Sequence, residues 1–387
     1  MNNLVLAWAA SFLCWVYVYS LRVAYSPALP NVISELQLSH SEAGLSFASY
    51  FYTYASLQFI AGFFGELFGR KRVIVAGMLI SSLGGMLTSI SHSLTSLVGT
   101  RLLTGLGHGL IFSNDRSLIA SLTPKDKLGL VQGLSFSGFG VGLMVGTAGA
   151  GALIPFIGWR QVLQLISVIG VIFSFFIILT VTESSERNDE PRVKLYGLLR
   201  DRNYMLMVFG GIPIQYTFWV FQTWLPTALL ESNMADLTSA ALVTSLVGVG
   251  TPIGLVTLGK LSDVADKRGG ERTVLFISSL LMTGLVGLLT LLYMWRAWLT
   301  VIAAVVLASG FFHGMSAPML RFISRNVGNG SPIAFGLLNG FHFIGSAVSP
   351  YITGLMRDVS GRFEPGLASG SLMMLISAAM FRALSKR

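Results

Sequence analysis

Charged side chains are scarce in this chain of 387 residues: Asp, Glu, Lys and Arg make up 11% of it, and hydrophobic residues make up 53%. A soluble protein carries about 25% charged residues. The composition therefore excludes an ordinary soluble domain and favours a protein embedded in a bilayer. The single cysteine, Cys14, excludes an intrachain disulfide. We expect no cleavable signal peptide, because the first apolar stretch has no basic segment before it and is too long for a signal core.

Acidic residues are almost absent from the apolar stretches. Asp115 is the one acid that falls clearly inside a predicted span, and Arg116 adjoins it. An exporter of cationic drugs would need a buried carboxylate. A membrane enzyme would need a catalytic set, and the spans show neither a metal motif nor such a set. The sequence therefore predicts no enzyme, no metal and no cofactor, and the lack of an extra soluble domain disfavours a receptor.

The apolar stretches fit twelve membrane-spanning helices of about 20 residues each. We predict them at 4–30, 43–65, 73–91, 97–121, 128–153, 159–182, 204–230, 238–259, 273–294, 297–323, 332–356 and 366–384. The predicted fold is an all-α membrane protein, with an N-terminal six-helix bundle at 1–183, a cytoplasmic linker at 184–203 and a C-terminal six-helix bundle at 204–387.

Basic residues lie unevenly between the loops. Most of the 26 Lys and Arg residues, including Arg70–Arg72 and Lys267–Arg268, fall in loops that share one side of the membrane with both ends of the chain. This positive-inside bias predicts cytoplasmic termini and a multi-pass protein of the cell membrane. It also accounts for the net charge of +9 without nucleic acid binding. We expect a monomer in contact with the lipid bilayer.

One stretch occurs twice in the chain. Gly105–Arg116 reads GLGHGLIFSNDR, and Gly310–Arg321 reads GFFHGMSAPMLR. In both copies a Gly stands three residues before a His, another Gly directly follows the His, and an Arg stands eight residues after it. Matching polar groups at matching depths predict two related bundles around a central site. His108 and His313 are the histidines of the two copies.

The first predicted span contains an arginine. Tyr19, Arg22 and Ser26 follow Trp15 at helical spacing and share one face. An arginine within a span costs a few kcal/mol on insertion scales, and it is tolerated where it faces a polar cavity or a partner. We therefore predict that Arg22 binds an anion. A structural hydrogen bond to a neighbouring helix and snorkelling to the outer surface are the alternatives.

Further polar residues share helical faces on the second, seventh and eleventh spans. The predicted substrate-binding residues are Arg22, Tyr19, Tyr54, Gln215, Gln222 and Asn339. The predicted proton-coupling residues are His108, His313 and His342. For Tyr54 the alternative is hydrogen bonding between helices, and for His108 and His313 it is packing, with hydrogen bonds, between glycine-rich helices. Glycines crowd the fifth span from Gly133 to Gly151. They predict a close packing seam rather than a nucleotide site, because no strand precedes them.

A charged motif recurs in the loops after the second and eighth spans. The first copy contains Glu66 and Arg70, and the second contains Asp263. We expect Gly65 and Gly69 to form a tight turn, and Glu66 to pair with the basic cluster or with nearby helix ends. Glu66, Arg70 and Asp263 are therefore predicted gating residues at the cytoplasmic surface.

Two six-helix halves with these loops resemble the major facilitator superfamily. The motifs Tyr19-x-x-Arg22, Arg101-x-x-x-Gly105-x-Gly107 and Trp224-Leu225-Pro226 resemble more closely the anion:cation symporters, which include sialin-like and sugar-acid carriers. The resemblance covers nearly the whole chain. It implies alternating access, with Arg22 binding a substrate carboxylate and Tyr54 assisting.

The chain departs from this family at three positions. Leu21 stands where the family often has Asp, His108 stands where it often has Glu, and Glu66 stands where Asp is usual. The first two acids are the usual proton carriers, so the resemblance does not imply carboxylate-driven symport here. We expect a secondary transporter for a small organic anion, coupled to protons if a histidine carries them. The alternatives are an inorganic-anion carrier of the nitrate type, an anion exchanger or uniporter and, less favoured, a multidrug exporter.

Overall fold

The computed structural model describes residues 2–124, 128–182, 195–265, 270–326 and 332–384. Within these residues the chain forms helices and no strand. It divides into two compact units: residues 1–38 and 45–189 form the first, and residues 39–44 and 190–387 form the second. The predicted linker, 184–203, lies largely outside the described residues, although the short helix α11 (Leu195–Arg200) falls within it.

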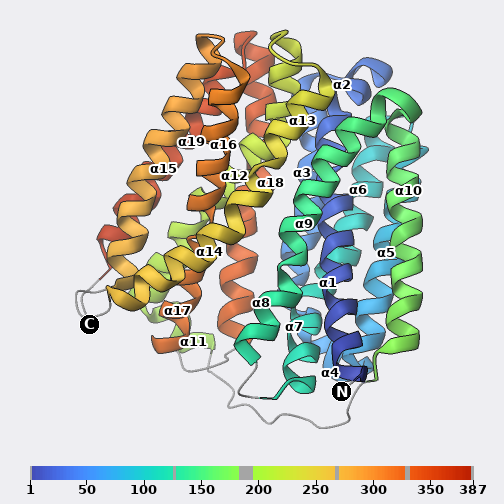
Figure 1. Ribbon diagram of the computed structural model, residues 1–387, viewed down its shortest axis with the longest axis vertical. Helices are drawn as coiled ribbons and strands as arrows, with labels where there is room; N and C mark the ends of the chain where they lie inside the picture. The colour runs from blue at the N-terminus through green and yellow to red at the C-terminus, as the bar shows by residue number, and fades with distance from the viewer. Residues whose placement is uncertain (1, 125–127, 183–194, 266–269, 327–331, 385–387) are drawn as a thin grey trace. The chain divides into compact units, whose positions relative to one another are not determined.

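Most of the first unit consists of ten α-helices and one π-helical turn in the described part of the chain (Figure 1). They are α1 (Asn2–Val23), α2 (Tyr25–Leu36), α3 (His40–Leu57), α4 (Ala61–Phe68), α5 (Arg70–Ser89), α6 (Leu94–Gly109), α7 (Ile111–Leu122), α8 (Leu128–Phe136), α9 (Gly138–Met144), η2 (Val145–Gly149) and α10 (Ala150–Thr180). Helix α5 packs against α6 and α10, and α1 packs against α9 and α10.

The second unit continues from α11 with eight longer helices in its described part. They are α12 (Arg202–Glu231), α13 (Leu237–Ser245), α14 (Val247–Val264), α15 (Gly270–Met294), α16 (Leu299–His313), α17 (Ser316–Asn326), α18 (Pro332–Ser360) and α19 (Glu364–Arg382). Helix α12 packs against α18 and α19, and α14 packs against α16. Asp201 and Asp236 cap the N-terminal ends of α12 and α13. The Asp201 carboxylate accepts the backbone N–H groups of Asn203 and Tyr204, and the Asp236 carboxylate accepts that of Ser239.

Eleven of the twelve predicted spans overlap one helix or two consecutive helices, and the fifth, 128–153, overlaps α8, α9, η2 and the beginning of α10. Among the described residues, seven stretches are long and apolar enough by themselves to cross a membrane: Val5–Leu36, Arg70–Ser89, Val131–Thr180, Arg202–Glu231, Leu237–Val264, Gly270–Met294 and Leu299–Ile323. The stretch Val131–Thr180 covers most of the predicted spans 128–153 and 159–182. Gly158, with φ of 80° and ψ of 157°, turns the chain between them.

Three glycines of the fifth predicted span pack closely as expected, whereas a Cβ atom on Gly133 or Gly149 would meet nothing within 4 Å. A Cβ atom on Gly138, Gly142 or Gly146 would lie 2.3 to 2.7 Å from backbone atoms of α1. The missing side chains therefore let α9 and η2 lie directly against α1. This contact holds the part of α1 that leads up to Arg22 against α9 and η2.

Each repeated Gly-His motif marks a break between two helices. Helix α6 ends at Gly109 directly after His108, and α16 ends at His313 directly before Gly314. Gly105 lets α6 approach α3, since a Cβ atom there would lie 2.0 Å from the Tyr50 carbonyl oxygen. Gly310 lets α16 approach α14 in the same way, at 2.6 Å from the Val247 carbonyl oxygen. The repeat in sequence is therefore a repeat of local structure.

The exposed and buried side chains are distributed as in a membrane protein. Large apolar side chains are strongly exposed on the outer helix faces, among them Phe156, Leu179, Val264 and Val359, each at least 81% exposed. In water such surfaces would associate. Many serines and threonines are buried, where they hydrogen-bond within or between helices. This pattern places lipid, not water, around the helices.

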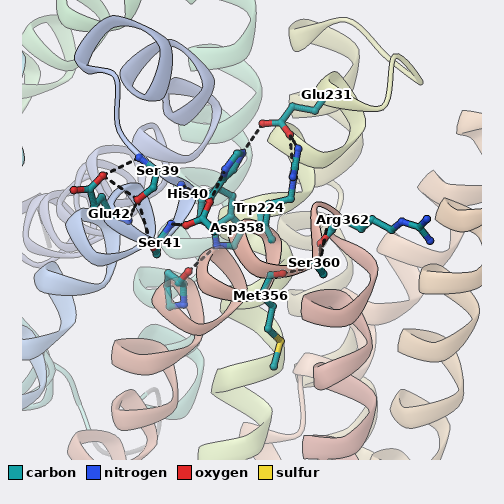
Figure 2. A network of polar contacts seen from close by, with 12 residues as sticks. Ser39, His40, Ser41, Glu42, Trp224, Glu231, Met356, Asp358, Ser360 and Arg362 are labelled. Carbon is teal, nitrogen blue, oxygen red and sulfur yellow. Dashed lines mark hydrogen bonds and ion pairs between the residues drawn. The ribbon is translucent and has the colours of Figure 1, made fainter.

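Residues 39–44 belong to the second unit. Figure 2 shows His40 between Asp358 of α18 and Glu231 of α12. His40 Nδ1 lies 3.1 Å from Asp358 Oδ1, and His40 Nε2 lies 2.8 Å from Glu231 Oε1. Arg357 forms an ion pair with the other oxygen of Glu231 at 3.0 Å. This polar cluster anchors the beginning of α3.

Candidate functional site

Arg22 is the centre of a buried aromatic cluster in the first unit. It lies in the last turn of α1 and is 0% exposed. Its guanidinium carbon lies 4.4 Å from the ring centroid of Tyr19, 5.0 Å from that of Tyr50 and 4.5 Å from that of Tyr54. Rings at these distances stabilise a cation and fix the plane of its donors. The structure thus brings together the predicted residues Arg22, Tyr19 and Tyr54.

A chain of hydrogen bonds joins Arg22 to His108. Arg22 Nε donates to the Tyr50 hydroxyl at 2.8 Å, and that hydroxyl lies 2.9 Å from His108 Nδ1. Since the hydroxyl oxygen accepts from arginine, its own proton is available to His108 Nδ1. A neutral His108 then carries its ring proton on Nε2. His108 is 0% exposed.

Tyr50 was not among the predicted binding residues, although the sequence contains a signal for it. Tyr50 and Tyr54 lie one turn apart on α3, and their rings stack with centroids 5.6 Å apart. Helical spacing therefore gave the correct face. It could not show that Tyr50 rather than Tyr54 bonds to His108, because that depends on where α6 meets α3.

A second buried arginine lies beside the same ring. Arg101 of α6 is 1% exposed. Its guanidinium carbon lies 4.6 Å from the ring centroid of Tyr25, 5.2 Å from that of Tyr50 and 5.4 Å from that of Phe47. Arg22 and Arg101 therefore both contact Tyr50.

The carboxylate of Asp115 is bonded to three neighbouring residues. It is 2% exposed, and its Oδ2 accepts from Trp15 Nε1 at 2.7 Å, from the Ser11 hydroxyl at 2.9 Å and from Arg116. In the part of the first unit that the structure describes, no other Asp or Glu is buried. The surroundings of Arg22 are accordingly aromatic and basic, and such a site favours anions.

The other predicted binding residues lie in the second unit. Gln215 is half-buried and Gln222 is buried on α12, and Asn339 is half-buried on α18. The His313 ring stacks on Phe218 with centroids 4.1 Å apart. His342 of α18 fits against Gly211 of α12, where a Cβ atom would lie 2.0 Å from His342 Nε2. His342 thus fills a packing position between two helices.

The two predicted gating motifs differ in their contacts. Asp263 accepts from Arg321 Nε at 2.8 Å, and Arg321 Nη1 also reaches Glu271 at 3.1 Å. Arg70 donates to the Ser117 carbonyl oxygen at 3.2 Å. Glu66 is exposed on α4 and forms no ion pair with the described residues, so the expected pairing with the basic cluster is not seen.

The expectation that Gly65 forms part of a turn is also wrong. Gly65 lies inside α4, and a Cβ atom there would lie 1.7 Å from Asn114 Oδ1. Its role is to let Asn114 of α7 pack against α4. The turn is at Gly69, with φ of 91°, a backbone conformation that favours glycine.

Comparison with known proteins places the chain in a family of carriers. It is 25% identical to a probable sulfoacetate transporter of Cupriavidus necator, over 93% of this chain and 90% of that protein. It is 25% identical to the hexuronate transporter of Bacillus subtilis, over 96% and 92%. It is also 25% identical to multidrug resistance protein 1 of Bacillus subtilis, over 91% and 90%.

The fold matches a solved structure as well. A bacterial homologue of the human lysosomal transporter Spinster, in an inward-facing and occupied conformation, aligns with a TM-score of 0.80 at 15% identity, covering 97% of this chain and 95% of that one. The model of the Major Facilitator Superfamily matches residues 8–350. The resemblance to this superfamily and to carriers of organic anions is thereby confirmed. The chain belongs to the Major Facilitator Superfamily and is a multi-pass transporter of the cell membrane, not an enzyme.

Proposed function

We propose that this protein moves a small organic anion bearing a carboxylate across the membrane by alternating access, through twelve spans with cytoplasmic termini. The observation that carries the proposal is the burial of Arg22 among Tyr19, Tyr50 and Tyr54. Sulfoacetate and hexuronates, which the relatives' names specify, are organic anions. This chemistry agrees with an arginine site.

The geometry of Arg22 suits a carboxylate. A guanidinium presents its donors in a planar fork that matches two carboxylate oxygens. The bond from Nε to the Tyr50 hydroxyl and the three ring contacts fix the orientation of that fork. Charge in a buried site is also screened less by salt and water than at a surface. Gln215, Gln222 and Asn339 remain proposed hydrogen-bonding partners of the substrate.

The same hydrogen bonds support the proposal of proton coupling through His108. A neutral His108 accepts a hydrogen bond from the Tyr50 O–H at Nδ1. A protonated His108 donates a hydrogen bond from Nδ1 instead, so the Tyr50 oxygen accepts from both neighbours and its O–H group, which keeps its proton, can donate a hydrogen bond to another acceptor. A substrate carboxylate beside Arg22 is such an acceptor. Proton binding and anion binding then each strengthen the other. If His108 only packs between helices, the protein is a uniporter or exchanger.

A panel of ligands tests the proposed substrate class. Thermal stability of the purified protein would be measured with gluconate, galacturonate, sulfoacetate, nitrate and tetraphenylphosphonium. A ligand that binds the folded state alone raises the melting temperature, and the rise grows with the logarithm of one plus the ratio of free ligand concentration to dissociation constant. We expect stabilisation by the organic anions and loss of this effect in Arg22→Ala. Stabilisation by nitrate alone would favour the inorganic-anion carrier, and stabilisation by the cation alone would favour a multidrug exporter.

A further inference from the structure

Arg101 is a buried cation whose charge has no counterpart in the described residues. Its Nε and Nη2 are buried and have no hydrogen-bond partner there. Its contacts are with the faces of Tyr25, Phe47 and Tyr50. Taking a cation out of water is costly unless an anion and hydrogen-bond acceptors replace the water. Aromatic faces offset part of that cost but accept none of these N–H bonds.

The described acidic residues of the first unit include no ion-pair partner for Arg101. Asp115 is the buried acid among its described residues, and it is bonded to Arg116, Trp15 and Ser11. Its pairing with Arg116 leaves no buried carboxylate among the described residues of the unit to balance the charge of Arg101. An anion from outside the protein would balance that charge.

Tyr50 holds the two arginines close together. Its ring centroid lies 5.0 Å from the guanidinium carbon of Arg22 and 5.2 Å from that of Arg101. The two carbons are therefore no farther apart than the sum of these distances, which one small molecule can bridge. Gly105 fixes this arrangement, because its missing side chain lets α6 contact α3 at the Tyr50 carbonyl oxygen, one turn after Arg101.

We propose that the transported substrate is a dianion, with one acidic group bound by Arg22 and the second bound by Arg101. This inference rests on the proposed function and narrows it, because a monoanion would leave Arg101 without a partner. The second group is a carboxylate or a sulfonate, since both present oxygens to a guanidinium. A short separation between the two groups is required, because both arginines contact the same ring.

Pairs of ligands that differ only in one acidic group test whether the protein binds the second charge of a dianion. Dissociation constants of the purified full-length protein would be measured by calorimetry for succinate and succinamate, and for glutarate and glutaramate. Each pair differs by replacement of one carboxylate with an amide. We expect the wild type to bind each dianion at least about tenfold more tightly than its monoamide, since a charge-assisted contact exceeds the roughly 1.4 kcal/mol that corresponds to a factor of ten.

Variants assign the preference to Arg101. In Arg101→Gln the ratio of the two dissociation constants falls to about one, while Arg101→Lys keeps a preference for the dianion. Arg22→Gln loses binding of both members of the pair. Arg362→Gln removes an exposed positive charge and leaves the ratio unchanged, which controls for net charge. Elution as a single species in size-exclusion chromatography confirms folding of each variant.

Three outcomes overturn the inference. If the wild type binds a dianion and its monoamide equally well, the inference fails without any variant, while the proposed function stands if Arg22→Gln abolishes binding of both. If Arg101→Gln weakens both ligands equally and leaves their ratio unchanged, Arg101 has a structural role only. If the wild type binds no organic anion at all, the proposed function fails together with this inference.

Discussion

Asp358 caps the helix that begins at His40. Its Oδ1 accepts the His40 backbone N–H at 3.0 Å, and its Oδ2 accepts the Ser41 backbone N–H at 2.8 Å. These atoms would otherwise be unpaired donors at the positive end of α3. Burial raises the pKa of the Asp358 carboxyl, but the hydrogen bonds from Ser41 and His40 outweigh it, so that the pKa lies below its ordinary value of 3.8.

Replacement of Asp358 by Ala should destabilise the protein by about 1 kcal/mol, the usual effect of losing an N-cap. Hydrogen exchange at the His40 and Ser41 amides should speed up, as measured by mass spectrometry. Asp236→Ala, which removes a similar cap from α13, is the matched control and should leave these two amides unchanged. Unaltered exchange in Asp358→Ala would mean that the cap contributes nothing to this segment.

The same contact predicts a dependence on pH. A carboxyl whose pKa is lower in the folded state contributes stability that is fully present above its unfolded pKa and is lost as pH falls through the folded value. The gap in melting temperature between wild type and Asp358→Ala should therefore persist at pH 7 and shrink below pH 3.8. A constant gap across this range would show that the charge of Asp358 is irrelevant to the contact.

Arg22→Lys and Arg22→Ala should both abolish uptake into reconstituted vesicles. Lysine retains the charge but not the planar fork that binds a carboxylate in two places, so we expect at least a tenfold loss for the conservative change. Both variants should still reach the membrane and elute as folded protein. Normal transport by Arg22→Ala would leave Arg22 with a structural role.

His108→Gln tests proton coupling. Glutamine retains hydrogen-bonding capacity but cannot accept a proton at neutral pH, so it should abolish substrate-driven proton flux in vesicles that contain a pH-sensitive dye. His313→Gln is the comparison, because its ring stacks on Phe218 and is not one of the groups in the hydrogen bonds from Arg22 through Tyr50 to His108. The wild type could instead move substrate without any proton flux. If His108→Gln then leaves the rate of substrate movement unaltered, the protein is a uniporter or exchanger.

Asp263→Asn should lower turnover more than substrate affinity. The change removes the negative charge that pairs with Arg321 at 2.8 Å. Asp263 is distant in sequence from the proposed binding residues. The exposed Glu66 forms no comparable ion pair in the described chain, so Glu66→Gln should have the smaller effect. Turnover comes from initial rates at saturating substrate, and affinity comes from calorimetry. A loss of affinity with unchanged turnover in Asp263→Asn would contradict a gating role.

Gly211→Ala should destabilise the second unit by about 1 to 3 kcal/mol, the usual cost of overpacking. The new methyl group would meet His342 Nε2 at 2.0 Å. Gly284→Ala is the control, since a Cβ atom there meets nothing within 4 Å, and it should be neutral or slightly stabilising. Equal melting temperatures for the two variants would show that the contact of α12 with α18 adapts without strain.

Helical periodicity and hydropathy were sufficient to predict the helices and the shared face of Tyr19 and Arg22. They also predicted that glycines of the fifth span form a packing seam, although not that Gly138, Gly142 and Gly146 pack against α1. Contacts between helices far apart in sequence were not predictable. Tyr50 meets His108 across 58 residues, and the meeting depends on the depth at which α6 crosses α3.

Single-residue conformations were equally hard to predict. Gly65 and Gly69 look alike in sequence, yet one lies within a helix beside Asn114 and the other forms the turn. The difference depends on a neighbour from α7, which no local pattern reveals. Glu66 was placed near basic residues by its sequence position, but the continuation of α4 to Phe68 leaves it on an exposed face.

The burial of Arg22 also constrains how the chain is made. Helix α1 leaves the ribosome before α3, and Tyr50, the hydrogen-bond partner of Arg22, follows it by 28 residues. At a synthesis rate of about 5–20 residues per second, the guanidinium waits a few seconds for that partner. During that interval Tyr19, on the same helix, covers one face of the cation. Release of α1 into lipid before α3 arrives would expose a charge to hydrocarbon, so we expect the insertion machinery to retain α1 until the two helices enter as a pair.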